Sequence, residues 1–150
     1  MAGVRAKVAS ERGQTIVEFA LIAPIIFLLL FGIIDFGMML DRRITLEHAV
    51  REGARFAAVT TDCSAIQQRT AERAGDIISQ DEVTVSYHEP DGTLITPPAA
   101  ATAGNEARVS APFEWEFPLL SRFGVNPIAT EVWGSASLEM AVTDAAGCSP

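Results

Sequence analysis

The stretch FALIAPIIFLLLFGIIDFGMML, residues 19–40, decides the fold, and Asp35 is its only charged residue. As an α-helix, these 22 residues span roughly 33 Å, which is enough to cross a bilayer core of about 30 Å. The stretch is longer than the apolar core of a cleaved secretory signal, and no small-x-small cleavage site follows it. It therefore predicts a retained membrane anchor, in which Pro24 should kink or locally break the helix.

The rest of the composition limits the class of protein. The chain has 150 residues, of which about 110 follow the apolar stretch, enough for one small core but not two. It carries 11 Lys and Arg against 19 Asp and Glu, for a formal charge of −8. Nucleic-acid binders carry a basic patch or stripe, so this acidity argues against a nucleic-acid partner.

After Arg43 the apolar residues recur at three- and four-residue steps, which is typical of an amphipathic helix. The membrane helix is therefore expected to continue without a break from Gln14 to about Val59. The residues expected on its apolar face are Leu46, Ala49, Val50, Gly53 and Ala57.

Beyond residue 60 the pattern changes from one helix to shorter segments. A helix is predicted over 64–78, capped by Asp62 or Ser64, and strands are predicted over 83–87 and 93–96 around a turn at 90–92. An exposed loop follows over 97–105. The remaining segments are a strand over 107–117 with a proline at 112, an irregular turn over 118–127 and a last strand region over 128–142. The predicted fold class is α+β: a long N-terminal transmembrane helix that continues into an amphipathic stalk, followed by a small, mainly antiparallel sheet.

Two acidic residues lie at or inside the apolar stretch. An unpaired carboxylate at Glu18 would be costly to bury, so Glu18 either reaches the lipid headgroups or meets a cation. Cleavage after Gly13 would create such a cation, the α-amine of Gln14, which could meet Glu18 of a neighbouring subunit. Asp35 either extends to the outer interface or makes an intramembrane polar contact with a partner helix.

The segment RGQTIVEFALIAPIIFLLLFGIIDFG, residues 12–37, resembles the class III signal of type IV pilin-like proteins. Gly13, followed by Glu18 and Phe19 and an apolar helix, carries the resemblance, which is closest to the TadE-like family of tight-adherence (Flp-type) pilus systems. The likeness extends over roughly residues 11–60 and includes Arg51-Glu52-Gly53-Ala54-Arg55, which is similar to the family's post-membrane helix.

The resemblance implies a minor pilin or pseudopilin that acts in pilus assembly. A prepilin peptidase would cleave after Gly13, and the other partners would be pilin-like subunits, the inner-membrane assembly platform and the lipid bilayer. The chain would divide into a leader (1–13), a transmembrane helix (14–40), its amphipathic continuation (41–60) and an extracytoplasmic α+β domain (61–150). It would cross the bacterial cytoplasmic membrane once, with the N-terminus inside and the C-terminus outside, and could enter an extracellular pilus.

Basic residues near the two ends of the apolar stretch are too evenly distributed to decide the orientation. An outward C-terminal domain would place Cys63 and Cys148 in an oxidising compartment, where they could form a disulfide. The alternative is two unrelated thiols.

No catalytic constellation is visible in the sequence, and no cofactor or metal is expected. His48 and His88 lack metal-ligand spacing, so both are expected to be solvated. Glu114 and Glu116 could act as an acid–base pair, but they are better explained as a solvated strand face. The stripe Phe113, Trp115 and Phe117 favours a core face, with a partner-binding patch as the alternative.

These observations leave a structural assembly protein as the leading hypothesis. The first alternative is an uncleaved single-pass membrane protein whose extracytoplasmic domain binds a ligand or adheres to a surface. That alternative requires neither cleavage at Gly13 nor Glu18. An exported enzyme is the third hypothesis and has no candidate site residues to support it.

Overall fold

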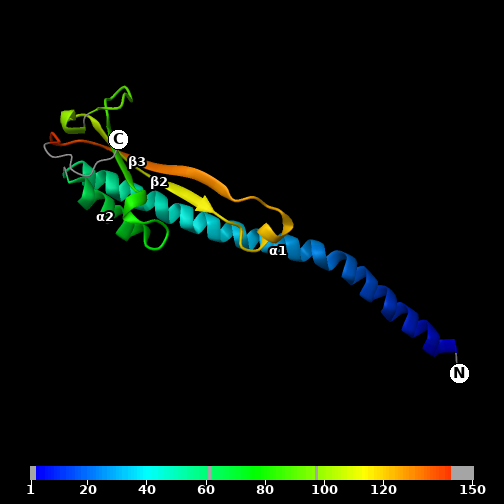
Figure 1. Ribbon diagram of the computed structural model, residues 1–150. Helices are drawn as coiled ribbons and strands as arrows, with labels where there is room; N and C mark the ends of the chain where they lie inside the picture. Colours follow the sequence, from blue (N-terminus) through cyan, green and yellow to red (C-terminus); the bar gives the residue numbers. More distant parts are fainter. Residues whose placement is uncertain (1–2, 61, 97, 143–150) are drawn as a thin grey trace. The chain divides into compact units, whose positions relative to one another are not determined.

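The computed structural model describes residues 3–60, 62–96 and 98–142 and divides into two compact units (Figure 1). The first unit contains the N-terminal helix up to Met38 and residues 117–126, and the second unit contains the rest. The elements are α1 (Gly3–Ala57), α2 (Cys63–Ala74), β1 (Thr84–His88), β2 (Glu106–Trp115) and β3 (Ile128–Ser137), with short 3-10 helices η1 (Gln80–Glu82), η2 (Pro98–Ala100) and η3 (Leu120–Phe123). The α+β class, a long apolar helix followed by a small antiparallel sheet, is confirmed.

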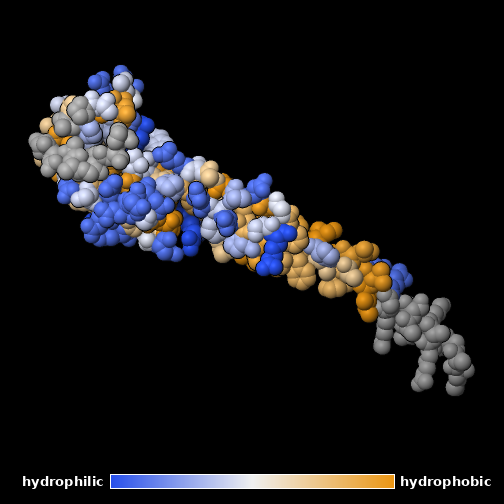
Figure 2. Space-filling view, viewed as in Figure 1, coloured by the Kyte–Doolittle hydropathy of each residue, from blue (hydrophilic) through white to orange (hydrophobic). Residues whose placement is uncertain are grey.

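Helix α1 has 55 residues and continues through Pro24, ending at Ala57, two residues before the predicted end. From residue 14 to 40 its large apolar side chains are mostly exposed, and Figure 2 shows them gathered along the helix. This part passes the length and hydropathy criteria for a membrane-spanning helix. Farther along, Leu46, Val50 and Ala54 are fully buried, so the predicted apolar face of the amphipathic part is a core face.

Helix α2 begins and ends at local signals in the sequence. The Asp62 carboxylate accepts hydrogen bonds from the backbone N–H groups of Ser64 (3.0 Å) and Ala65 (3.2 Å), so Asp62 is the N-cap. Gly75 follows Ala74 with a φ of 69°, a conformation that glycine adopts without strain. The helix therefore stops at Ala74, and the predicted extension to residue 78 is wrong.

The three strands form one antiparallel sheet in the order β1-β2-β3, with Val85 opposite Val109 and Val109 opposite Gly134. In the second unit this sheet lies along the C-terminal half of α1 (Figure 1). The approach is close: a Cβ at Gly134 would lie 2.9 Å from both the Cα and the backbone nitrogen of Arg51. Residues pointing inward from the sheet form the core with α1 and α2; they include Val85, Tyr87, Ala107, Val109, Ala111, Phe113, Trp115 and Val132.

Two predicted strand segments differ from the structure. Residues 93–96 form no strand, and only an isolated bridge joins His88 to Leu94 beyond the turn. The last strand ends at Ser137 instead of continuing to residue 142, because β2 begins at Glu106, the partner of Ser137. The backbone N–H of Glu139 instead donates to the Ala58 carbonyl at 3.0 Å.

Pro112 lies inside β2, the central strand of the sheet, although proline is normally confined to edge strands and bulges. Strand β1 pairs with β2 only from Glu106 to Ser110, so β2 has no β1 partner at Pro112. On that side β2 is locally an edge strand, which is where a residue without an N–H is tolerated.

Candidate functional site

The residues of the predicted processing site lie within α1, which is helical on both sides of Gly13. The Gln14 Nε2 donates a hydrogen bond to the Glu18 Oε1 at 3.2 Å, as expected for residues one helical turn apart. Both side chains are exposed, and Phe19 is 67% exposed. The structure therefore presents Gln14, Glu18 and Phe19 on an accessible surface, with an amide as the neighbour of the Glu18 carboxylate.

Asp35 behaves differently from Glu18, because it is fully buried inside the first unit. Its Oδ2 accepts hydrogen bonds from the backbone N–H groups of Leu119 (3.1 Å) and Leu120 (2.8 Å). The ring centroids of Phe36 and Phe117 lie 5.5 Å apart beside it. Neither expectation for Asp35 named the contact that the structure shows, which is with the backbone of residues 119 and 120. Asp35 binds its own chain because residues 117–126 return to the apolar helix.

This contact explains how η3 begins. The first N–H groups of a helix have no partner within it, and a carboxylate can accept their hydrogen bonds. Asp35 supplies this acceptor from 84 residues away in the sequence for Leu119. Its Oδ1 is also buried and has no hydrogen-bond partner among the described residues. No local sequence signal near residue 35 could have identified these partners.

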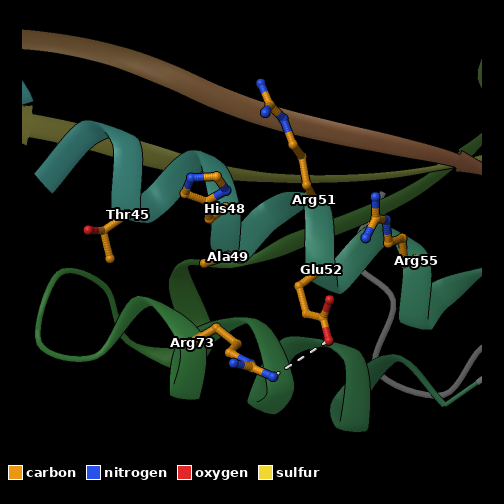
Figure 3. A pocket seen from close by; sticks show the side chains of 7 residues that line it. All are labelled: Thr45, His48, Ala49, Arg51, Glu52, Arg55 and Arg73. Carbon is orange, nitrogen blue, oxygen red and sulfur yellow. Dashed lines mark ion pairs between the residues drawn. The ribbon is translucent and has the colours of Figure 1, made fainter. Parts of the chain in front are cut away.

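A pocket of about 520 Å³ lies in the second unit, on α1 and α2 (Figure 3). Six lining residues come from α1 and one from α2: Thr45, His48, Ala49, Arg51, Glu52, Arg55 and Arg73. Three of the seven lining residues are arginines and one is a glutamate, so the excess of positive charge favours an anionic group over a cationic one.

Ion pairs organise this basic pocket. Glu52 lies 3.4 Å from Arg69 and 3.8 Å from Arg73, the second of which is drawn in Figure 3. Arg51 lies 3.5 Å from Glu47, which precedes it by one helical turn. Arg55 makes no ion pair with another described residue. The predicted post-membrane segment 51–55 thus supplies both the pocket wall and the link to α2.

Cys63 is buried at the start of α2 and is disulfide-bonded. Cys148, its partner in the sequence prediction, lies outside the described residues, so the pairing stays a prediction. The Tyr87 hydroxyl lies 3.8 Å from the Cys63 Sγ. Burial raises the pKa of Tyr87 above 10.0, so its hydroxyl stays protonated at neutral pH.

The residues considered for catalysis do not converge. His48 is exposed, whereas His88 is half-buried and hydrogen-bonded to Ser86 Oγ (3.0 Å) and the Gly92 carbonyl (3.1 Å). His88 is therefore only partly exposed, because the turn after β1 folds back onto it. Glu114 and Glu116 are exposed, as predicted for a solvated strand face. The described residues contain no group of three or more His, Cys, Asp or Glu that could hold a metal.

The aromatic stripe is a core face, with Phe113, Trp115 and Phe117 only 2%, 8% and 2% exposed. Sequence reasoning missed a different aromatic, Trp133, which is 56% exposed on the outer face of the sheet. The Arg108 guanidinium lies 4.7 Å from the centre of the Trp133 ring, within the range of a cation–π contact. Strand alternation puts Trp133 on the outer face, but the sequence alone did not show which face is buried.

The family model described as TadE-like protein matches residues 13–55. The match begins at Gly13 and ends at Arg55, so it covers the apolar helix and the basic segment of the pocket, and it confirms the resemblance to this family. The match indicates similarity to proteins of the tight-adherence pilus, and among the described residues one helix is long and apolar enough to cross a membrane. No curated protein and no solved structure matches the chain.

Proposed function

We propose that this protein is a minor pilin or pseudopilin that acts in assembling a tight-adherence pilus after a prepilin peptidase cleaves it following Gly13. The observation that carries the proposal is the TadE-like match over residues 13–55, which begins at that glycine. The exposed apolar surface of α1 supports it, since helices of this kind pack against lipid or against other subunits. The protein would act by assembly and would catalyse no reaction.

Within this proposal, Glu18 has a specific task. Cleavage would give Gln14 a free α-amine, one helical turn from an exposed carboxylate whose hydrogen-bond partner among the described residues is a neutral amide. In a bundle of staggered helices, the amine of one subunit can pair with Glu18 of the next. A low dielectric strengthens this attraction, so the charge pair would guide packing between subunits.

The first experiment measures the intact mass of the protein isolated from membranes of its native host. A chain that begins at Gln14 supports the proposal, and a chain that begins at Met1 in a host with the peptidase contradicts it. The Gly13→Val variant should retain the leader, whereas Gly37→Val should be processed normally. Gly37 is a matched control because it is also a helical glycine, and a Cβ there would meet nothing within 4 Å.

A second experiment separates packing from processing. The Glu18→Ala variant should lose pilus assembly, measured by the amount of sheared fibre. The control is Glu72→Ala, which breaks a similar Gln–Glu hydrogen bond, that from Gln68 at 2.9 Å, on α2. Normal assembly by Glu18→Ala would contradict the role given to Glu18. An uncleaved chain that still sustains adhesion would favour an anchored ligand-binding or adhesion protein.

A further inference from the structure

The feature that the proposed function leaves unexplained is the turn of residues 117–126, which joins β2 to β3 and belongs to the same compact unit as the apolar helix. Figure 1 shows this turn, with η3 in it, lying against α1. A connecting turn between two strands has no need of a buried carboxylate 84 residues away. Its attachment to Asp35 therefore indicates that the position of the turn along the helix has a role of its own.

The attachment fixes the depth of the turn relative to the apolar stretch. Asp35 lies five residues before Leu40, so the contact is about 7.5 Å inside the end of that stretch. Two hydrogen bonds from the turn's backbone to Asp35 and the packing of Phe117 against Phe36 hold the turn there. If the helix spans a bilayer, the turn lies at the boundary between hydrocarbon and headgroups.

The exposed side chains of the turn suit that boundary. Leu120 is buried, but Phe123 is 61% exposed and Val125 is 39% exposed. Arg122 is exposed between Leu120 and Phe123 and can reach a lipid phosphate with its long side chain. Gly124, with a φ of 84°, ends η3 and reverses the chain between the two exposed apolar residues. Large apolar side chains beside one arginine are typical of segments that lie in a membrane interface.

We propose that the turn of residues 117–126 inserts into the lipid interface on the C-terminal side of the membrane helix, with Phe123 and Val125 in the acyl boundary and Arg122 at the phosphates. Asp35 is the positioning residue that ties the turn to the helix. The occupant is the bilayer because the helix surface that continues from the turn is itself apolar and exposed, including Ile33 at 63%. The proposal rests on the single membrane crossing and is independent of cleavage after Gly13.

This arrangement also accounts for a charged residue inside an apolar span. A carboxylate at that depth would be costly without partners, and the turn brings two backbone N–H donors to it. The donors in turn would be unsatisfied near hydrocarbon without Asp35. The hydrogen bonds to Oδ2 thus offset part of the desolvation cost of both the carboxylate and the N–H groups, which ties the turn to the helix.

The test uses the full chain in vesicles of phosphatidylcholine with phosphatidylglycerol, diluted to at most one chain per vesicle. A nitroxide is attached at Phe123→Cys or Val125→Cys, and its collision rates with oxygen and with a water-soluble nickel chelate are measured. The parent chain, treated with the same label, gives the background signal from any site other than the introduced cysteine. Two reference sites calibrate the assay: Leu29→Cys in the apolar helix, which reports membrane insertion, and Ser135→Cys on the exposed face of β3.

The proposal expects the ratio of oxygen to nickel collisions at residues 123 and 125 to be several-fold higher than at residue 135, approaching the value at residue 29. Asp35→Ala should lower the ratio at residue 123, since the turn is released, while the ratio at residue 29 is unchanged. Asp35→Asn keeps a carbonyl acceptor and should preserve much of the effect.

Each other outcome overturns the proposal. A water-like ratio at residues 123 and 125, with residue 29 in lipid, places the turn in solvent although the helix spans the membrane. Low collision rates with both reagents show that the turn is covered by protein instead of lipid. A ratio at residue 123 that Asp35→Ala does not change removes the positioning role of Asp35. None of these results bears on whether the leader is cleaved, which the intact mass decides separately.

Discussion

The two halves of α1 follow the same helical geometry and differ in where their apolar side chains go. Between residues 14 and 40 those side chains are mostly exposed, with Leu29 at 61%. Between residues 41 and 57 a buried stripe runs along one face of the helix, and it includes Leu46 at 0%, Val50 at 0% and Ala54 at 0%. One half is apolar all round and needs an apolar solvent, whereas the other is amphipathic and is covered by its own domain. Leucines in the two halves therefore contribute to different properties, membrane insertion in one half and domain stability in the other. Matched substitutions can distinguish these two contributions.

The largest expected effect is at Leu46. Leu46→Ala should lower the free energy of unfolding of the domain by about 2–5 kcal/mol, because a buried leucine is lost and a cavity remains. Urea unfolding of the full chain in nanodiscs, followed by the fluorescence of Trp115 and Trp133, measures this. The matched variant Leu29→Ala should leave that transition unchanged. Equal destabilisation by the two variants would show that the comparison between the halves is wrong.

The reverse test places a charge in the apolar half. Leu29→Arg should oppose membrane integration by about 2.5–3.5 kcal/mol, the cost of an arginine near the centre of a spanning helix. The fraction of chain that resists carbonate extraction from membranes reports this cost. The control is Leu94→Arg, since Leu94 is 45% exposed in the turn after β1. Unchanged extraction of Leu29→Arg would mean that residue 29 does not lie in the bilayer.

A smaller effect is expected where the second half of α1 meets the sheet. Gly134→Ala should destabilise the domain by about 1–3 kcal/mol, because the new Cβ would meet the backbone of Arg51 at 2.9 Å and neither backbone can yield cheaply. The comparison is Gly32→Ala in the apolar half, where a Cβ would meet nothing within 4 Å. The same urea transition measures both. A neutral Gly134→Ala would show that β3 lies farther from α1 than the structure places it.

The smallest effect is a pH dependence at the start of α2. Hydrogen bonds from the Ser64 side chain and from the backbone lower the pKa of Asp62 below its ordinary value of 3.8. The ionised cap therefore stabilises the folded state above that value, and its contribution is lost as the pH falls through the lowered pKa. As the pH is lowered below about 4, the urea concentration at the midpoint of unfolding should decrease slightly more steeply in the parent than in Asp62→Asn. Asparagine caps the helix without titrating, so its contribution does not change with pH. Identical profiles would remove Asp62 from the acid sensitivity of the domain.

Much of the fold was predictable because its signals are local. The apolar stretch, the stripe that begins at Leu46 and the alternation through Phe113 and Trp115 each follow from the period of a helix or strand. Element ends were less predictable, as α2 shows: Gly75 stopped it, although apolar residues at helical spacing continue to Ile78. The predicted return strand over 93–96 is absent, because the pairing beyond the turn is limited to one isolated bridge between His88 and Leu94.

The candidate site was predictable only in part. Gly13, Glu18 and Phe19 carry the resemblance to pilin-like signals, and the family match covers them. The pocket required α2 to bring Arg73 beside Glu52, which no spacing in the sequence reveals.

By itself, the sequence determined that a long apolar helix precedes a small acidic α+β domain, because hydrophobic periodicity acts over neighbouring residues. The tertiary structure decided which groups meet across the chain. Asp35 binds the N–H groups of Leu119 and Leu120, and Gly134 lets β3 approach α1. Such contacts depend on strand register and on where a turn closes, and a buried polar group accepts whichever donor that geometry brings to it.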